Sequence, residues 1–116
     1  MATKQEVEQY LNEFKAKTAF FQIFFLDDRG KNSQALADLD LTPIKRKEII
    51  EKLVLEDYSE GPLVEKMRGI LPMWVFGKIV KDTEVYIKIS MGVPNSNTIC
   101  ISFHPSEYPI KYPFKT

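Results

Sequence analysis

The stretch that decides the fold is Glu84–His104, EVYIKISMGVPNSNTICISFH, which predicts two β-strands joined by a turn rich in Gly, Pro and Asn. Side chains alternate across a strand, so each of the two strands has one apolar face and one polar face. The apolar faces carry Val85, Ile87 and Ile89 in the first strand and Ile99, Ile101 and Phe103 in the second, and the polar faces carry Glu84, Tyr86, Lys88 and Ser90, then Cys100, Ser102 and His104.

The alternation also restricts how the two strands pair. If they run antiparallel with both apolar faces on the core, the numbers of paired residues must share parity. A turn at Gly92–Asn97 then places Tyr86 opposite His104. In the same register Lys88 lies opposite Ser102, and a slip by two residues moves each pair only to a diagonal neighbour. We therefore expect these four side chains to share a face, with the sole histidine of the chain at its end.

Length and composition indicate a single domain over residues 1–116, for which we expect an α+β fold with N-terminal helices on a mainly antiparallel sheet. The chain is 44% hydrophobic and 28% charged, which is typical of a globular protein. It has no apolar run of membrane-spanning length and no signal-peptide pattern, so we expect a cytoplasmic protein without a membrane partner. With one cysteine and one histidine, it can form neither an internal disulfide nor a Cys/His zinc cluster.

The net charge is zero, which is unusual for a strong nucleic-acid binder, and we expect no direct binding to DNA. Residues 1–60 hold 9 basic and 12 acidic side chains, whereas residues 61–116 hold 7 and 4. The β-rich half is therefore the more basic one. Ordinary surface variation explains this asymmetry nearly as well as a functional preference.

The N-terminal half predicts helices around one strand. Thr3–Glu6 has the form of a capping box and begins an amphipathic helix that runs to about Lys17. Ala19–Leu26 is rich in β-formers and predicts a buried strand. After a turn, Asn32 or Ser33 is expected to cap a short helix.

A further helix begins with Thr42 as its N-cap and Pro43 in its first turn, and it runs to about Leu53. Its inward side is expected to hold Ile44, Ile49, Ile50, Leu53 and Val54, with Lys45, Arg46, Lys47 and Glu48 in solvent. Leu55–Pro62 should leave the helix in an extended path, and residues 63–71 should form a loop or a short helical turn.

Met73–Val80 predicts a strand that pairs with the one at Glu84. Its alternation places Val75 and Ile79 on one face. A three-residue turn at Lys81–Thr83 keeps these two residues on the core side. The other face of the strand then brings Trp74, Phe76 and Lys78 next to Tyr86 and Lys88. The three prolines of the tail after His104 predict an extended segment along the domain.

The residue types on this face favour chemistry without a metal or a cofactor. Carboxylates and histidines do not cluster, and no glycine-rich phosphate loop is present. A Cys100–His104 nucleophile pair is conceivable, but a structural thiol is the commoner arrangement. The remaining set suits RNA cleavage by its own 2′-hydroxyl. Tyr86, His104 and Lys88 are the candidate catalytic residues, and Lys78, Trp74, Phe76 and Ser102 are the candidate RNA-binding residues.

Non-catalytic interpretations of the same residues stay open. A lone histidine at a strand end and a tyrosine in mid-strand are common in sheets without activity. On residue types alone, such a structural interpretation is favoured. The alternatives to an enzyme are a catalytically silent module that holds a protein partner and a module that binds RNA without cleaving it.

The ordered motifs of the chain resemble the MqsR family of type II toxin–antitoxin toxins. The resemblance covers residues 35–58, ALADLDLTPIKRKEIIEKLVLEDY, then a strand that begins near Trp74, then VYIKI at 85–89 and ICISF at 99–103. A Bacteroidetes-type branch of that family is closer still, and its pattern includes RGKN, DYSEGP, MWVFGK, EVYIKI, CISFH and YPFK. The resemblance implies a RelE-like α+β fold and an mRNA-cleaving endoribonuclease, that is, an mRNA interferase that arrests growth.

The resemblance can be carried over only position by position. The family's catalytic tyrosine matches Tyr86, with Lys88 two residues later. Its catalytic lysine after the last strand falls on His104, and two further family positions, a lysine and a glutamine, are Glu60 and Val75 here. We favour a branch that cleaves with histidine, because histidine transfers protons at neutral pH more readily than an ordinary lysine.

The resemblance also implies two partners. One is the mRNA substrate. The other is a cognate MqsA-like antitoxin, with a zinc-binding N-terminal part that covers the toxin and a helix-turn-helix part that binds operator DNA.

Overall fold

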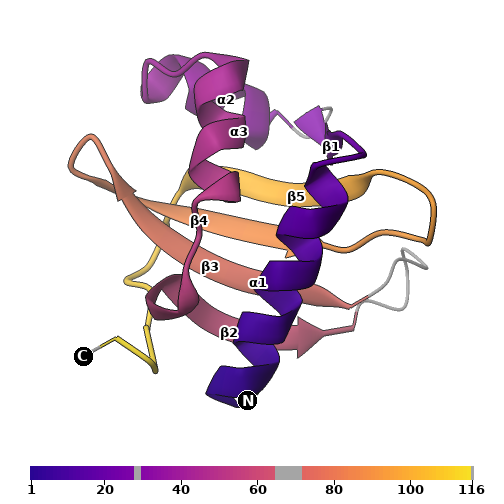
Figure 1. The fold of residues 1–116 in the computed structure, drawn as a ribbon. Coiled ribbons are helices and arrows are strands. Elements are labelled where there is room, and N and C mark those ends of the chain that lie inside the picture. The colour runs from indigo at the N-terminus through magenta and orange to yellow at the C-terminus, as the bar shows by residue number, and fades with distance from the viewer. Residues whose placement is uncertain (28–29, 65–71, 116) are drawn as a thin grey trace.

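A computed structural model describes residues 1–27, 30–64 and 72–115. Within them, helices pack on a five-stranded, mostly antiparallel sheet of order β1-β5-β4-β3-β2, which confirms the predicted α+β class (Figure 1). The elements are α1 (Lys4–Thr18), β1 (Ile23–Phe25), α2 (Lys31–Asp38), α3 (Pro43–Glu51), the 3-10 helix η2 (Leu55–Asp57), β2 (Tyr58–Leu63), β3 (Met73–Val80), β4 (Thr83–Ser90) and β5 (Thr98–Pro105).

Helix α1 crosses one face of the sheet (Figure 1). Its N-terminus has the predicted capping box: the Thr3 hydroxyl accepts from the Glu6 amide, and the Glu6 carboxylate accepts from the Thr3 amide. The predicted apolar stripe is buried, since Val7, Leu11 and Phe14 are each at most 4% exposed. The helix therefore covers one side of the core. Within the described residues, no helix is long and apolar enough to span a membrane.

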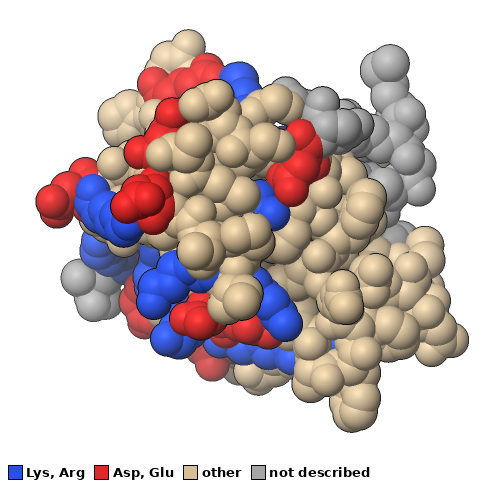
Figure 2. Space-filling view, turned by 90° about the horizontal axis from the view of Figure 1, so that it is seen from above, with Lys and Arg blue, Asp and Glu red and all other residues tan. Residues whose placement is uncertain are grey.

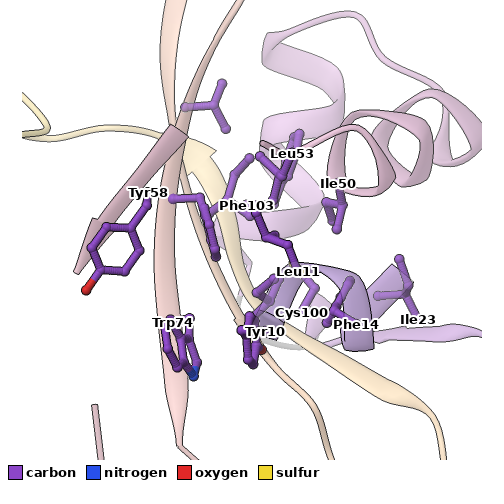
Figure 3. Close-up of a cluster of buried hydrophobic side chains, with 14 of the residues drawn as sticks. Tyr10, Leu11, Phe14, Ile23, Ile50, Leu53, Tyr58, Trp74, Cys100 and Phe103 are labelled. Carbon is purple, nitrogen blue, oxygen red and sulfur yellow. The ribbon is translucent and has the colours of Figure 1, made fainter. Parts of the chain in front are cut away.

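Aromatic side chains from distant parts of the chain close the core (Figure 3). Tyr10 on α1 stacks on Trp74 of β3, with ring centroids 4.4 Å apart. Tyr58 on β2 stacks on Phe114 of the C-terminal tail at 5.4 Å. Offset aromatic stacking stabilises such pairs beyond the burial of their area. The tail is thereby attached to the same core that α1 covers.

The predicted pairing of β4 with β5 is confirmed in the part of the hairpin that contains Tyr86 and Lys88. Tyr86 pairs with His104, and Lys88 pairs with Ser102. Beyond these pairs a bulge shifts the register by one residue. A one-residue shift moves side chains to the other face of the sheet. Cys100 therefore joins the buried core instead of the polar face that it was predicted to share with His104.

The predicted pairing of β3 with β4 is wrong. Their turn contains two residues, Lys81 and Asp82, and not three, because Val80 pairs with Thr83. Both turn residues have positive φ, 49° and 66°, as a type I′ hairpin turn requires. Such a turn suits the natural twist of the strands. It also turns β3 over, so that Trp74, Phe76 and Lys78 lie on the α1 side of the sheet.

Strand β1 is shorter and less buried than predicted. It pairs in parallel with β5 at the edge of the sheet. Phe20 lies before the strand and is 88% exposed, and Phe24 within it is 55% exposed.

Residues 18–26 and 89–103 contain no charged side chain. In Figure 2 the charged side chains gather on the left, and the right, toward β1 and the 91–97 loop, is mostly uncharged.

Two predictions about α2 and α3 are also wrong. Gly30, not Asn32 or Ser33, is the N-cap of α2. The Asn32 amide instead joins α2 to the sheet: Nδ2 donates to the Ile101 carbonyl and Oδ1 accepts from the Phe103 amide, each at 2.9 Å. A buried amide is stable only with its hydrogen bonds made, which explains why this side chain turns inward.

Helix α3 begins as predicted, with the Thr42 hydroxyl accepting from the Lys45 amide and Pro43 at its first turn. However, Arg46 is 3% exposed, not solvated, and Ile44 is 72% exposed, not inward. Arg46 forms two hydrogen bonds to the Asp27 carboxylate and lies 3.6 Å from the Phe25 ring centroid. This ion pair and stacking compensate its burial.

The segment predicted as merely extended, Leu55–Pro62, contains η2 and most of β2. The predicted loop at residues 63–71 lies largely outside the described residues. After β5, the tail runs past the strand ends from β5 toward β2 and has no helix or strand in its described part, as the prolines predicted (Figure 1).

Candidate active-site cleft

The face of the sheet that α1 does not cover carries the polar side chains of the hairpin. Because strand neighbours share a face, Glu60, Val75, Lys88 and Ser102 form one row across β2, β3, β4 and β5. Gly77, Tyr86 and His104 form the next row. We call this side of the sheet the cleft face.

The three predicted catalytic residues lie close together on the cleft face. The rings of Tyr86 and His104 stack with centroids 5.6 Å apart and planes 27° apart. The Lys88 ammonium lies 5.8 Å from the Tyr86 ring centroid. Among the described residues, Lys88 has no ion-pair partner, so its charge is available to a ligand. The predicted placement of these three side chains is confirmed, and their catalytic role stays a prediction.

A cleft of about 560 Å³ opens over the second row. This volume lies within the range of small-molecule sites. One wall is the sheet, and the other is the tail after β5. Its lining comprises Ser59, Glu60, Tyr86, His104, Ser106, Glu107, Tyr108, Pro109, Ile110 and Lys111.

The tail is fixed over the cleft face through Glu84. One carboxylate oxygen accepts from the Ile110 amide at 3.0 Å, and the other accepts from the Tyr112 hydroxyl at 2.9 Å. The tail also needs a glycine beneath it: a Cβ at Gly77 would lie inside contact distance of Tyr112 Oη and 2.9 Å from Ile110 Cδ1. A side chain at position 77 would therefore displace the Tyr112 ring and the end of the Ile110 side chain from the sheet.

The electrostatics of the cleft favour a neutral Tyr86. Its partial burial, and then the negative charge of Glu60, raise the pKa of this phenol above its usual value. At neutral pH Tyr86 is therefore a hydrogen-bond donor and not a base. Glu60 is exposed, and it has no ion-pair partner among the described residues.

The tautomer of neutral His104 follows from its neighbour. Its Nδ1 lies 3.0 Å from the Pro105 carbonyl oxygen. A carbonyl oxygen can only accept, so Nδ1 carries the proton and Nε2 keeps its lone pair. His104 therefore presents one nitrogen that can take up a proton or, once protonated, give it to a ligand.

The other carboxylate of the cleft is already engaged. Glu107 forms a short ion pair with Lys31 of α2. The hydrogen bond from Lys31, and then its positive charge, lower the pKa of Glu107. Of the two acidic side chains in the cleft lining, only Glu60 is without such a partner in the described part of the chain.

Three predicted RNA-binding residues are not in the cleft. Trp74 is 9% exposed beneath Tyr10, and Phe76 is fully buried, so neither ring can stack on a base. Lys78 pairs with the Asp57 carboxylate at 3.0 Å. The type I′ turn that reverses β3 is the cause of all three errors. Ser102, the fourth, is on the cleft face as predicted but is 8% exposed.

Three cleft residues were missed by reasoning from the sequence. Glu60 was named only as a departure from the family pattern, and its place in the cleft depends on β2, which was not predicted. Tyr108 and Lys111 lie in the tail. In the sequence, only the three spaced prolines of the tail indicate its structure. They predict an extended path but not where that path lies.

The structure also bears on a thiol and on metal ions. Burial raises the pKa of the Cys100 thiol to about 12, and its Sγ lies 3.4 Å from the Ser102 carbonyl. A buried, protonated thiol is not a nucleophile. In the part of the chain that the structure describes, no group of three or more His, Cys, Asp or Glu side chains could hold a metal ion.

No protein-family model, no curated protein and no solved structure matches this chain.

Proposed function

We propose that this protein is an endoribonuclease that cleaves mRNA through attack of the 2′-hydroxyl, and that it is the toxin of a type II toxin–antitoxin system. The observation that carries the proposal is the meeting of Glu60, Tyr86 and His104 in one cleft, with Lys88 beside it. These are groups for proton transfer and for stabilising negative charge, which are what this reaction needs.

The position of the two departures from the family pattern supports the same proposal. Glu60 pairs with Val75, and Val75 pairs with Lys88. Both substituted positions therefore lie beside Tyr86 and His104 on the sheet. Positions 60, 75, 86 and 104 of the family pattern thus lie close together on one face of the sheet. This is consistent with a single site in which some residues have been substituted.

The reaction can be written with its protons balanced. The 2′-oxygen of a ribose bonds to the adjacent phosphorus, and the bond from phosphorus to the 5′-oxygen breaks. The products are a 2′,3′-cyclic phosphate and a free 5′-hydroxyl. One side chain takes the 2′-hydroxyl proton, a second gives a proton to the leaving oxygen, and no oxidant, reductant or metal takes part.

We propose Glu60 and His104 for these two roles. Glu60 on β2 and His104 on β5 lie on opposite sides of Tyr86, about 14 Å apart as strands. In-line attack places the incoming and leaving oxygens on opposite sides of phosphorus. Glu60 then takes the 2′-hydroxyl proton and His104 protonates the leaving oxygen. Tyr86 donates a hydrogen bond to the phosphate between them, and Lys88 supplies positive charge.

The toxin assignment adds a cytoplasmic location, growth arrest and a cognate MqsA-like antitoxin that binds zinc and DNA. These follow from the family resemblance and not from the cleft itself. The net charge of the protein is zero. This is compatible with an mRNA substrate that is bound transiently through few phosphate contacts.

The decisive experiment is a cleavage assay on single-stranded RNA with a metal chelator present. We expect the wild-type protein to leave 2′,3′-cyclic phosphate ends and to spare an RNA with a 2′-deoxyribose at the cleaved position. His104→Ala and Glu60→Gln should each lower kcat about 100-fold or more.

Glu8→Gln is the matched control, because Glu8 is an exposed carboxylate on α1 and does not line the cleft. It should cleave like the wild type. Intact RNA after incubation with the wild-type protein would contradict the enzymatic proposal. Tight binding to the antitoxin in that case would favour the catalytically silent module of the same fold.

A further inference from the structure

One large aromatic side chain of the cleft has no role in the reaction. Tyr108 lies in the tail, lines the cleft with Tyr86 and His104, and is 78% exposed. In sites that bind single-stranded nucleic acid, exposed aromatic rings serve as stacking surfaces for the bases. The two aromatic rings predicted to stack on a base, Trp74 and Phe76, are in the core instead.

The backbone around Tyr108 is held on both sides. Before it, the Ser106 amide donates to the Glu84 carbonyl at 2.8 Å, and the Ser106 hydroxyl donates to the Tyr108 carbonyl. After it, the Ile110 amide is bonded to the Glu84 carboxylate. The ring is thus presented by a fixed segment, which lowers the entropy that ordering it on a ligand would cost.

The chemistry next to Tyr108 fits a strand of nucleic acid. Lys111, exposed and in the same wall, has no ion-pair partner among the described residues and can contact a phosphate. An aromatic ring beside a cationic side chain is the combination that binds unpaired bases along a backbone. The site of cleavage at Tyr86 lies on the opposite wall, within the same cleft of about 560 Å³.

We propose that the tail segment 106–111 is the second wall of the RNA-binding cleft, in which Tyr108 stacks on an unpaired base next to the cleaved phosphate. This inference rests on the proposed ribonuclease function. It makes Glu84 a positioning residue, because its carboxylate fixes the segment that carries the ring.

The test uses a short single-stranded RNA that carries 2-aminopurine beside the cleavage site and a 2′-O-methyl group at it, so that the RNA binds without being cut. Stacking on a ring quenches the fluorescence of 2-aminopurine. We expect quenching with the wild type and with Tyr108→Phe, because the ring and not the hydroxyl is needed. Tyr108→Ala should abolish the quenching and weaken binding about 5- to 150-fold, the range for one stacked base.

The matched control is Phe20→Ala, which removes an exposed ring outside the cleft and should change neither quenching nor binding. In cleavage assays Tyr108→Ala should raise KM and leave kcat within about threefold. If the wild type cleaves RNA and Tyr108→Ala retains the quenching and the KM, the inference is wrong and the proposed function stands. Binding with quenching but no cleavage would support Tyr108 as a stacking ring for RNA, and it would refute both the ribonuclease and the place of that ring next to a cleaved phosphate. Absence of binding would overturn both.

Discussion

The two faces of strand β4 differ in what covers them and in what they can do. On the α1 side, Val85, Ile87 and Ile89 are fully buried in the core, to which α1 contributes its stripe of apolar residues. On the cleft side, Tyr86 and Lys88 are only partly covered, by a tail without regular structure. Neighbouring residues of one strand thus belong to two environments.

This difference separates stability from chemistry. Burial of apolar area is the main favourable term in folding, so the α1 side should dominate the free energy of unfolding. The cleft side buries polar groups that hold the tail and leaves others free for a ligand. A substitution on the α1 side of β4 should therefore lower the stability of the protein, whereas one on the cleft side should lower its activity.

The largest effect is expected from a pair of adjacent substitutions on β4. Ile87→Ala leaves a cavity in the core and should lower the free energy of unfolding by about 2–5 kcal/mol. Lys88→Ala should change it by less than about 0.5 kcal/mol and yet lower kcat about 100-fold through lost stabilisation of the phosphate. Urea unfolding and RNA cleavage of the two purified variants measure this contrast. Equal losses of stability would show that the two faces are not separate.

An intermediate effect is expected from Gly77→Val, which tests the tail as a wall of the cleft. A valine suits the strand itself, but its side chain would occupy the space of Tyr112 and Ile110. The hydrogen bonds to Glu84 should then break, at a cost of about 1–2 kcal/mol. Amide exchange should speed up at Ile110, whose N–H donates to Glu84, but not in the core residues of β4.

The control for this substitution is Ile79→Val, two residues further on the same face of β3, where the side chain is 60% exposed. It should leave exchange at Ile110 unchanged. Unchanged exchange in Gly77→Val as well would mean that the tail does not depend on the space above the glycine.

The two hairpins show why part of the fold could be predicted from the sequence. In β4 and β5 both strands alternate in sequence, so parity restricted the register, and the assumed turn at Gly92–Asn97 then selected the pairing of Tyr86 with His104 that the structure has. In β3 both faces carry apolar residues, and the alternation does not say which face is inside. The choice then depended on the turn, and Lys81–Asp82 lacks the Asn-Gly signal of a type I′ turn although it adopts one.

The cleft was predictable only as far as local patterns reach. Tyr86, Lys88 and His104 lie in strands whose periodicity is visible. Glu60 depends on the pairing of β2 with β3, which contains two register shifts, and Tyr108 depends on where an irregular tail comes to rest. Neither is determined by local propensity, because both are fixed by contacts between segments far apart in the chain.

The smallest effect is expected at alkaline pH, from the hydrogen bond that holds the tail. Burial, then the hydrogen bond to Glu84 and its charge, raise the pKa of Tyr112 above the ordinary value near 10. The folded protein therefore keeps this proton at a pH where the unfolded chain has lost it. The stabilisation is complete below about pH 10 and decreases as the pH rises further.

Tyr112→Phe should therefore cost about 1 kcal/mol at pH 7, and this difference from the wild type should shrink above pH 10 in urea unfolding. Tyr10→Phe is the contrasting variant on the α1 side. Burial raises the pKa of Tyr10 too, but its hydroxyl has no hydrogen-bond partner in the described structure. Removing the Tyr10 hydroxyl should leave the free energy of unfolding unchanged at pH 7 and should reduce the loss of stability at alkaline pH. If Tyr112→Phe behaved in the same way, the hydroxyl bond to Glu84 would not be what holds the tail against the sheet.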